Sequence, residues 1–198
     1  EDIHELKEED INTLDLEPEN NLTEWYKRLR NTINESDFTL TVEPKIDGVA
    51  VSILYDDGRL KYAATRGDGS TGDDITQNIL TIDSIPSNIK NLNGGKFELR
   101  GEVFIANDDF ESLNLSREES GEPKFINPRN ATAGTIKLLD PNVVATRPLK
   151  LIFHSFGIIE KEKFEKLENF REFLISEKLP YDRWFRVAKT ENDLIQSI

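Results

Sequence analysis

The feature that most constrains the fold is a short polar turn between two apolar runs. Residues 49–55 and 60–65 have the composition of β-strands, and Asp56-Asp57-Gly58-Arg59 joins them. An Asp-Gly pair between apolar runs is typical of a tight β-hairpin, because the turn needs a positive backbone φ that glycine adopts without strain. The pattern therefore predicts an antiparallel hairpin over residues 49–65.

The rest of the chain alternates between further strands and helices. Amphipathic spacing and capping residues predict the helices, and apolar runs predict the strands. The expected helices are 22–33, 107–119 (capped by Asn107 or Asp108), 131–138, 162–178 and one from 191 onward, with a helical turn in 73–80. The expected further strands are 38–43, 97–105, 149–158 and 184–187. Hairpins with interspersed helices indicate an α+β domain of largely antiparallel sheets with flanking helices.

The composition excludes several classes of site. The 198 residues contain no Cys, which excludes a disulfide scaffold, a thiolate metal site and a Cys nucleophile. With two His residues in the sequence, we expect no metal cluster built from several histidines. No apolar run approaches the roughly 18 residues that a membrane-spanning helix needs, so we expect no membrane partner. The chain also lacks Met, and we interpret it as a piece of a longer polypeptide.

Charge is distributed unevenly along a chain whose formal net charge is −13. The first 20 residues carry nine acids and one base, which we interpret as a solvated linker, with an acidic interaction arm as the alternative. We assign residues 1–21 to this acidic segment and expect one domain over 22–198. Residues 124–150, the basic strip, carry five bases against Asp140 alone. Such a strip could meet phosphates, although five bases also suit an ordinary surface.

The main candidate for covalent chemistry is Lys45, in the segment Glu43-Pro44-Lys45-Ile46-Asp47-Gly48 between two expected strands. A lysine amine is a nucleophile only when it is deprotonated, and a free lysine has a pKa near 10.4. A nucleophilic lysine therefore needs burial, or nearby cations such as Arg66 or a metal. Lys-x-Asp-Gly alone is a weak motif. The alternative is a strand-end lysine in a salt bridge beside an Asp-Gly turn.

Four more polar motifs follow along the chain. The glycine-rich segment 65–72 offers Arg66 as a phosphate-binding fork and glycines that let the backbone approach a ligand. A plain hairpin loop is the alternative, and an Arg-Gly-Asp adhesion tripeptide is a weaker one, because the chain shows no extracellular marker. The later motifs are Arg100-Gly101-Glu102, the segment from Asn127 to Gly134, and Leu139-Asp140-Pro141.

Together these five segments resemble the adenylation (nucleotidyltransferase) domain of the bacterial NAD-dependent DNA ligases. Lys45-Ile46-Asp47-Gly48 is similar to the nucleophile motif of that family, and the four later motifs match family segments in the same order and at similar spacing. The resemblance covers residues 22–198 and is densest over 43–158. It implies a nucleotidyltransferase fold, similar to ATP-grasp folds, that is incomplete at its C-terminus.

The resemblance implies a role for each nucleotide-binding motif. Lys45 would attack the α-phosphate of NAD, expel nicotinamide mononucleotide and hold AMP as a phosphoramidate, while Asp47 would orient the lysine. Glu43 would lie near the adenine, and Arg66 would contact the ribose or the phosphate. Glu102 would accept a hydrogen bond from a ribose hydroxyl.

The resemblance implies roles for three further side chains, and Glu102 has an alternative interpretation. Arg129 and Lys137 resemble the DNA-backbone contacts of the family, and both lie in the basic strip. His154 stands where the family usually has an aromatic residue, often Tyr, that stacks on the adenine; a core or strand-end histidine is the alternative. Glu102 could instead pair with Arg100, because alternation along a strand places the two on the same face.

Some family features are altered or absent in these 198 residues. Thr13-Leu14 lies where the family has a Ser-Leu pair that contacts the nucleotide, but the flanking residues and the spacing to the next helix differ. Two later motifs that each supply a lysine, and the nicotinamide-binding domain, are not found. One missing electrostatic partner costs about 3–4 kcal/mol of transition-state stabilisation. We therefore expect the chain alone to ligate nothing and to self-adenylate poorly or not at all.

The resemblance also implies partners and a location. NAD would donate AMP, Mg²⁺ would offset phosphate charge, and nicked double-stranded DNA would receive the AMP in replication and repair. The protein would be a cytoplasmic, nucleoid-associated monomer. Two alternatives stay open. One is a non-catalytic relative that binds a nucleotide or a partner. The other is an ATP-dependent ligase or RNA-capping enzyme, which would share Lys-x-Asp-Gly but not the segment from Asn127 to Gly134.

Overall fold

The described residues of the computed structural model are 18–33, 38–90, 92, 94–160, 164 and 167–198. They form two compact units. Unit 1 combines Glu1–Pro44 with Trp184–Ile198, and unit 2 is Lys45–Arg183. Most of the acidic segment lies outside the described residues, and its boundary at residue 21 stays a prediction.

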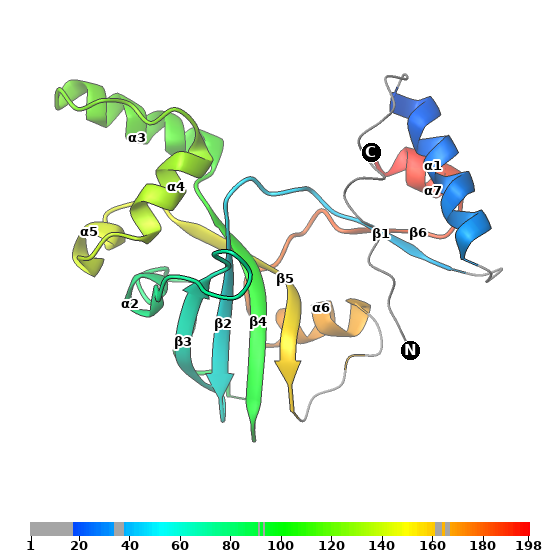
Figure 1. The fold of residues 1–198 in the computed structure, drawn as a ribbon, viewed down its shortest axis with the longest axis horizontal. Coiled ribbons are helices and arrows are strands. Elements are labelled where there is room, and N and C mark those ends of the chain that lie inside the picture. The colour runs from blue at the N-terminus through cyan, green and yellow to red at the C-terminus, as the bar shows by residue number, and fades with distance from the viewer. Residues whose placement is uncertain (1–17, 34–37, 91, 93, 161–163, 165–166) are drawn as a thin grey trace. The chain divides into compact units, whose positions relative to one another are not determined.

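Unit 2 is built on a four-stranded antiparallel sheet in the order β3-β2-β4-β5 (Figure 1). Its strands are β2 (Val49–Asp56), β3 (Arg59–Thr65), β4 (Lys96–Phe104) and β5 (Lys150–Ile159). β2 and β3 form the expected hairpin, and both turn residues have positive φ, 48° at Asp57 and 74° at Gly58. A two-residue turn of this kind matches the right-handed twist of the paired strands, so the predicted hairpin is confirmed.

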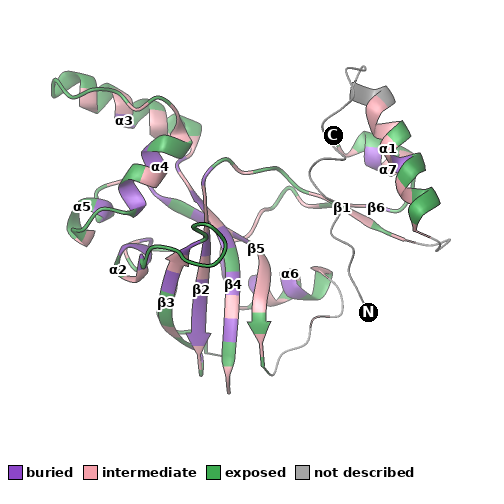
Figure 2. Ribbon diagram, viewed as in Figure 1, coloured by how far each residue is buried: buried purple, intermediate pink, exposed green. Residues whose placement is uncertain are grey.

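One face of this sheet carries the core of unit 2. Alternate side chains of β2 and β4, among them Ile53 and Leu99, are fully buried, as the purple segments of these strands show in Figure 2. The segment after β3, which contains α2 (Thr76–Ile79), adds five buried isoleucines between residues 75 and 89 to the same core. The opposite face of β4 carries the ionisable side chains of Lys96, Glu98, Arg100 and Glu102, and we call it the polar face.

Three helices gather beyond the end of the sheet at which β2 begins (Figure 1). They are α3 (Asn107–Glu119), α4 (Pro128–Ile136) and α5 (Pro141–Ala145). α4 begins before the predicted residue 131, because the Asn127 side chain accepts the backbone N–H of Asn130 and Pro128 suits the first helical position. α5 was not predicted; Asp140 caps it by accepting the backbone N–H of Asn142.

Two details of the predicted helices are wrong. The N-cap of α3 is Ala106, which has no side-chain cap hydrogen bond, so Asn107 and Asp108 already lie inside the helix. The helix predicted over 162–178 ends earlier in the structure, where α6 spans Leu167–Ser176; the predicted residues 162, 163, 165 and 166 lie outside the described residues. Phe164 packs in a cluster of aromatic side chains. The ring partners of Phe164 are Phe97, Phe156, Phe170 and Phe173.

Unit 1 joins segments that are far apart in the sequence. Its elements are α1 (Pro18–Thr32), β1 (Leu40–Val42), β6 (Arg186–Ala188) and α7 (Glu191–Gln196). β1 pairs with β6 in antiparallel register, with Leu40 opposite Ala188. Tyr26, Ala188 and Leu194 form a small core. Both strands are shorter than predicted, and α1 begins four residues earlier than the predicted residue 22.

The architecture is therefore a mixed α/β arrangement with antiparallel sheets and flanking helices, as the sequence predicts. The finer assignment to a nucleotidyltransferase fold stays a prediction. Within the described ranges, no helix has both the length and the apolar character that crossing a membrane requires.

Candidate active site

The Lys45–Gly48 loop leads into β2 and lies against β4. Gly48 is buried, and a Cβ at this position would come within 2.1 Å of the Val103 carbonyl oxygen and 3.0 Å of Glu102 Cγ. The backbone N–H of Gly48 donates a hydrogen bond to the Glu102 carboxylate. The loop that carries the predicted nucleophile is thereby fixed beside the predicted ribose-binding carboxylate, while the Lys45 side chain is exposed.

Glu102 is half-buried on the polar face of β4. Burial raises the pKa of its carboxyl group, and the negative charge of Asp47 acts in the same direction. The positive charge of Arg129 and the Gly48 N–H oppose this shift without reversing it. Glu102 therefore holds its proton more strongly than an exposed glutamate does.

Glu98, which sequence reasoning missed, is the partner of Arg100. The Arg100 Nε contacts Glu98 Oε1 at 3.0 Å, so the alternative pairing of Arg100 with Glu102 is wrong. Burial acts to raise the pKa of Glu98, but hydrogen bonds from the Ser52 hydroxyl (2.6 Å), the Ile158 N–H (3.1 Å) and Arg100 outweigh it and lower the pKa. The two-residue spacing of Glu98, Arg100 and Glu102 places all three on one face, and it could have suggested this pair.

Asp47 and Arg129 form an ion pair, with 3.2 Å between Oδ1 and Nη1. Both side chains are mostly exposed, so the pair contributes little to stability. Its importance is positional, because it brings the first turn of α4 to the Lys45–Gly48 loop. The predicted orientation of Lys45 by Asp47 and the predicted contact of Arg129 with DNA stay predictions.

Arg66 lies two strands from Glu102. The Arg66 N–H donates to the carbonyl oxygen of Ala50 at 2.9 Å, and Ala50 is the register partner of Glu102. Adjacent strands are about 4.8 Å apart, so roughly 10 Å separates the two backbones. A ligand that lies across this part of the sheet can reach both the Glu102 carboxylate and the exposed Arg66 side chain.

The glycine-rich loop after Arg66 is closed largely by its own contacts. The Asp68 carboxylate accepts the backbone N–H groups of Ser70 (2.9 Å) and Thr71 (2.7 Å). A Cβ on Gly67 would lie 1.7 Å from the Thr71 carbonyl oxygen, whereas one on Gly69 would meet no atom within 4 Å. The conformation of the loop itself therefore explains why residue 67 is a glycine. This favours the interpretation of Gly67 as part of a plain loop.

His154 lies at an irregularity in the pairing of β4 with β5. Arg100 is opposite Ser155 and Gly101 is opposite Phe153, so His154 has no register partner, as at a β-bulge. Its side chain is exposed, yet partial desolvation and the positive charge of Arg100 lower the pKa of its ring. The neutral imidazole is therefore favoured. Stacking of His154 on an adenine stays a prediction.

The bases of the basic strip are largely compensated in the structure. Lys137 Nζ lies 2.7 Å from Asp73 Oδ2, and this lysine lowers the pKa of Asp73. Three more bases of the strip also contact acids outside it. These pairs are Lys124–Glu118, Arg129–Asp47 and Lys150–Asp109. The excess of positive charge counted along the sequence therefore overstates the positive potential of this surface.

Asn78 positions the end of α4 that carries Lys137. Its side-chain amide is buried and donates to the carbonyl oxygens of Ile136 (2.7 Å) and Leu138 (2.8 Å). Sequence reasoning missed Asn78, because a polar residue in an isoleucine-rich segment gives no indication of partners about sixty residues away.

The last two predicted site features are Glu43 and the magnesium ion. Glu43 is exposed and belongs to unit 1, and its contact with adenine stays a prediction. Among the described residues no group of three His, Cys, Asp or Glu side chains could hold a metal ion. Mg²⁺ commonly takes one or two carboxylates together with substrate phosphates, and Asp47 and Glu102 are suitable carboxylates for such a shared ion.

Comparison with known proteins shows which family this chain is similar to. Residues 11–198 match the model of the NAD-dependent DNA ligase adenylation domain. The DNA ligase of Akkermansia muciniphila is 46% identical over 157 residues, which cover 79% of this chain and 20% of that protein. The DNA ligase of Methylacidiphilum infernorum is 42% identical over 175 residues, covering 88% and 25%. The DNA ligase of Thermodesulfovibrio yellowstonii is 41% identical over 174 residues, covering 87% and 26%.

This chain thus spans about a fifth to a quarter of the length of these relatives. The family model nevertheless covers nearly the whole chain, including every motif that carries the resemblance. The match separates the chain from ATP-dependent ligases and RNA-capping enzymes. The chain belongs to the family of NAD-dependent DNA ligase adenylation domains.

Proposed function

We propose that this chain, as the adenylation domain of a longer protein, forms a lysine-AMP intermediate from NAD at Lys45 and passes the AMP to the 5′-phosphate of nicked DNA, and that the chain alone is weakly active or inactive. The observation that carries the proposal is the fixing of the Lys45–Gly48 loop beside Glu102, through the Gly48 N–H and the close contact with β4. In a member of this family, that arrangement places the loop of the proposed nucleophile next to the proposed sugar-binding carboxylate.

The first step joins the amine of Lys45 to the α-phosphorus of NAD. The deprotonated amine forms a phosphorus–nitrogen bond, and the bond from phosphorus to the bridging oxygen breaks. Nicotinamide mononucleotide leaves with the electron pair of that bond. Glu102 accepts a hydrogen bond from a ribose hydroxyl, and Arg66 binds phosphate or ribose oxygens. Mg²⁺ supplies additional positive charge when bound.

The later steps require contact with nicked double-stranded DNA. The 5′-phosphate takes the AMP from Lys45, and the 3′-hydroxyl then displaces the AMP to seal the nick. Arg129 and Lys137 are the proposed contacts with the DNA backbone. Each now contacts a carboxylate, Asp47 or Asp73, so a DNA phosphate takes the place of that carboxylate on binding. The proposal assigns the parent protein to replication and repair, as a monomer at the cytoplasmic nucleoid.

The test is the intact mass of the chain after incubation with NAD, ATP or GTP in the presence of Mg²⁺. We expect that any gain of one AMP comes from NAD alone and disappears in Lys45→Ala. Lys61→Ala is the matched control, because Lys61 is also an exposed lysine of unit 2 but lies on β3. Labelling from ATP, or labelling that persists in Lys45→Ala, would contradict the proposal.

A second arm keeps the test decisive, because we expect weak labelling of the isolated chain. The same incubation is repeated with the chain supplied with the nicotinamide-binding domain and the later lysine motifs of this family. Labelling of Lys45 from NAD in that sample supports the proposal. Its absence there would favour the alternative of a non-catalytic nucleotide-binding relative.

A further inference from the structure

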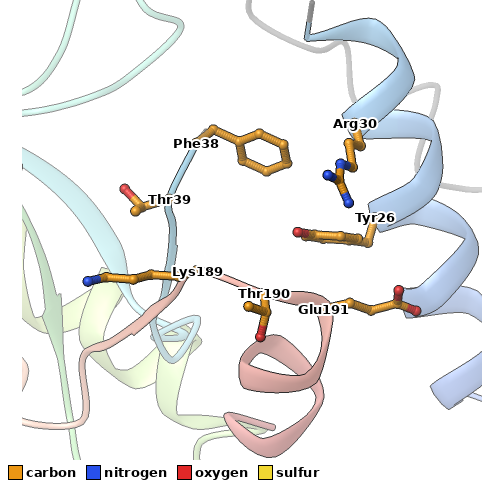
Figure 3. Close-up of a pocket in the computed structure, with 7 residues that line it drawn as sticks. All are labelled: Tyr26, Arg30, Phe38, Thr39, Lys189, Thr190 and Glu191. Carbon is orange, nitrogen blue, oxygen red and sulfur yellow. The ribbon is translucent and has the colours of Figure 1, made fainter. Parts of the chain in front are cut away.

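Unit 1 contains a cavity of about 450 Å³ that the proposed function does not use. It lies between α1, the residues that precede β1 and the start of α7, as Figure 3 shows. Cavities of a few hundred Å³ suit small organic ligands. Its lining residues are Tyr26, Arg30, Phe38, Thr39, Lys189, Thr190 and Glu191.

Tyr26 presents a polar atom to this cavity. Its side chain is only 7% exposed, and its hydroxyl points toward the middle of the group of lining residues (Figure 3). Among the described residues, the hydroxyl makes no hydrogen bond. The hydroxyl opens to the cavity, so it is available to a hydrogen-bond donor or acceptor on a bound molecule.

The cavity has one aromatic side and one cationic group directed into it. The ring centroids of Tyr26 and Phe38 are 5.8 Å apart with a 41° tilt, and the partly exposed Phe38 lines the cavity as an aromatic surface for a flat ring. In Figure 3 the Arg30 guanidinium is directed toward the group of lining residues, while the Lys189 amine extends away from it. Arg30 is therefore the group that can bind an anion inside the cavity, and Lys189 adds attraction at its rim.

Glu191 completes the set of groups from a third side. It lines the cavity at the start of α7 and is partly buried. A carboxylate can only accept hydrogen bonds when it is ionised, so its natural partners are hydroxyl or amino groups of a ligand. The cavity thus combines an aromatic surface, an anion-binding guanidinium with a tyrosine hydroxyl, and a hydroxyl acceptor.

We propose that this cavity binds a mononucleotide. The base lies against Phe38, the phosphate accepts hydrogen bonds from Arg30 and the Tyr26 hydroxyl, and Glu191 accepts a sugar hydroxyl. The site lies wholly within unit 1, so it is separate from the Lys45 site of unit 2 and does not depend on the proposed function.

The test follows backbone amide NMR signals of the 198-residue chain during titration with AMP, adenosine or inorganic phosphate. We expect AMP to shift the signals of Thr39 and Thr190 with a Kd at least tenfold lower than that of adenosine or phosphate. Arg30→Gln and Tyr26→Phe each weaken this binding by about tenfold, because each removes a hydrogen bond to a charged group. Arg28→Gln is the matched control, since Arg28 is an exposed arginine of α1 that does not line the cavity.

The readout separates this proposal from the function of unit 2. AMP bound at the Lys45 site shifts the Gly48 signal, and Glu102→Gln weakens only that response. No shift at Thr39 and Thr190, or a shift that Tyr26→Phe and Arg30→Gln leave unchanged, would overturn the proposal. Inorganic phosphate that binds as tightly as AMP would also overturn it, because the aromatic surface would then contribute nothing. Tyr26→Phe retains the ring, so the small core of unit 1 is preserved in this variant.

Discussion

Glu98 and Glu102 lie four residues apart on one face of β4, yet the pKa of Glu98 is lowered and that of Glu102 is raised. The difference lies in the number of donors each carboxylate receives. Glu98 accepts from Ser52, Ile158 and Arg100, and these bonds outweigh its burial. Glu102 receives the N–H of Gly48, which does not offset its burial.

For Glu98, we predict that Glu98→Gln lowers the free energy of unfolding by about 1–2 kcal/mol at neutral pH, because hydrogen bonds to a charged acceptor are lost. A lowered pKa means that this stabilisation is present above the unfolded-state pKa and is lost as the pH falls through the folded-state pKa. Urea unfolding at several pH values checks the prediction. A difference that persists in strong acid would show that the charge of Glu98 is not the cause.

For Glu102, we expect the opposite change in the free energy of unfolding. At neutral pH, Glu102→Gln raises the free energy of unfolding by less than about 1 kcal/mol, since the folded state no longer holds a half-buried charge. Below the unfolded-state pKa the glutamate is protonated in both states, and the difference disappears. The same urea series measures this, and a neutral-pH loss of stability would contradict it.

At the scale of elements, two glycines offer a direct comparison. We predict that Gly48→Ala destabilises the protein by about 2 kcal/mol or more, because its Cβ would meet the Val103 carbonyl oxygen at 2.1 Å. Gly134→Ala, inside α4 and with only Phe125 Cε1 at 3.9 Å, should instead stabilise by about 0.5–1 kcal/mol. Thermal unfolding of both variants is the measurement. Equal effects would contradict the close approach of the loop to β4.

Local patterns predicted the elements better than they predicted the contacts between them. The hairpin turn at Asp57-Gly58 and the end of α3 before Gly121 follow from rules that act over a few residues. The aromatic cluster does not, because Phe164 packs against Phe97, which lies far from it in the sequence. Short strands such as β1 are also hard to place, since their limits depend on the partner strand.

The same limit applies to the candidate site. The sequence motifs identified Lys45, Glu102 and Arg129, and the structure brings the loop of Lys45 to Glu102. The pairing of Arg129 with Asp47 joins residues 82 positions apart, and no local rule predicts it. The compensation of the basic strip was missed for the same reason, because its acidic partners lie in other parts of the chain.

At the scale of the whole molecule, each unit has its own apolar core, and that of unit 1 is much the smaller. We predict that unit 1 unfolds first on heating. Leu194→Ala should lower the free energy of unfolding of unit 1 by about 2–4 kcal/mol, because Leu194 is only 4% exposed. The unfolding of unit 2 should stay unchanged. Leu115→Ala, at a position 59% exposed, is the control. Hydrogen exchange resolves the two units, and a single cooperative loss of protection would contradict the prediction.

The pairing of β1 with β6 has a consequence for the order of synthesis. Leu40 is translated long before its partner Ala188, and at about 5–20 residues per second roughly 7–30 s pass between them. All of unit 2 is translated within that interval, so its sheet can form before the strand partner of β1 has been translated. On the ribosome, β1 therefore gains its strand partner only after unit 2 has been translated, although β1 emerges before unit 2.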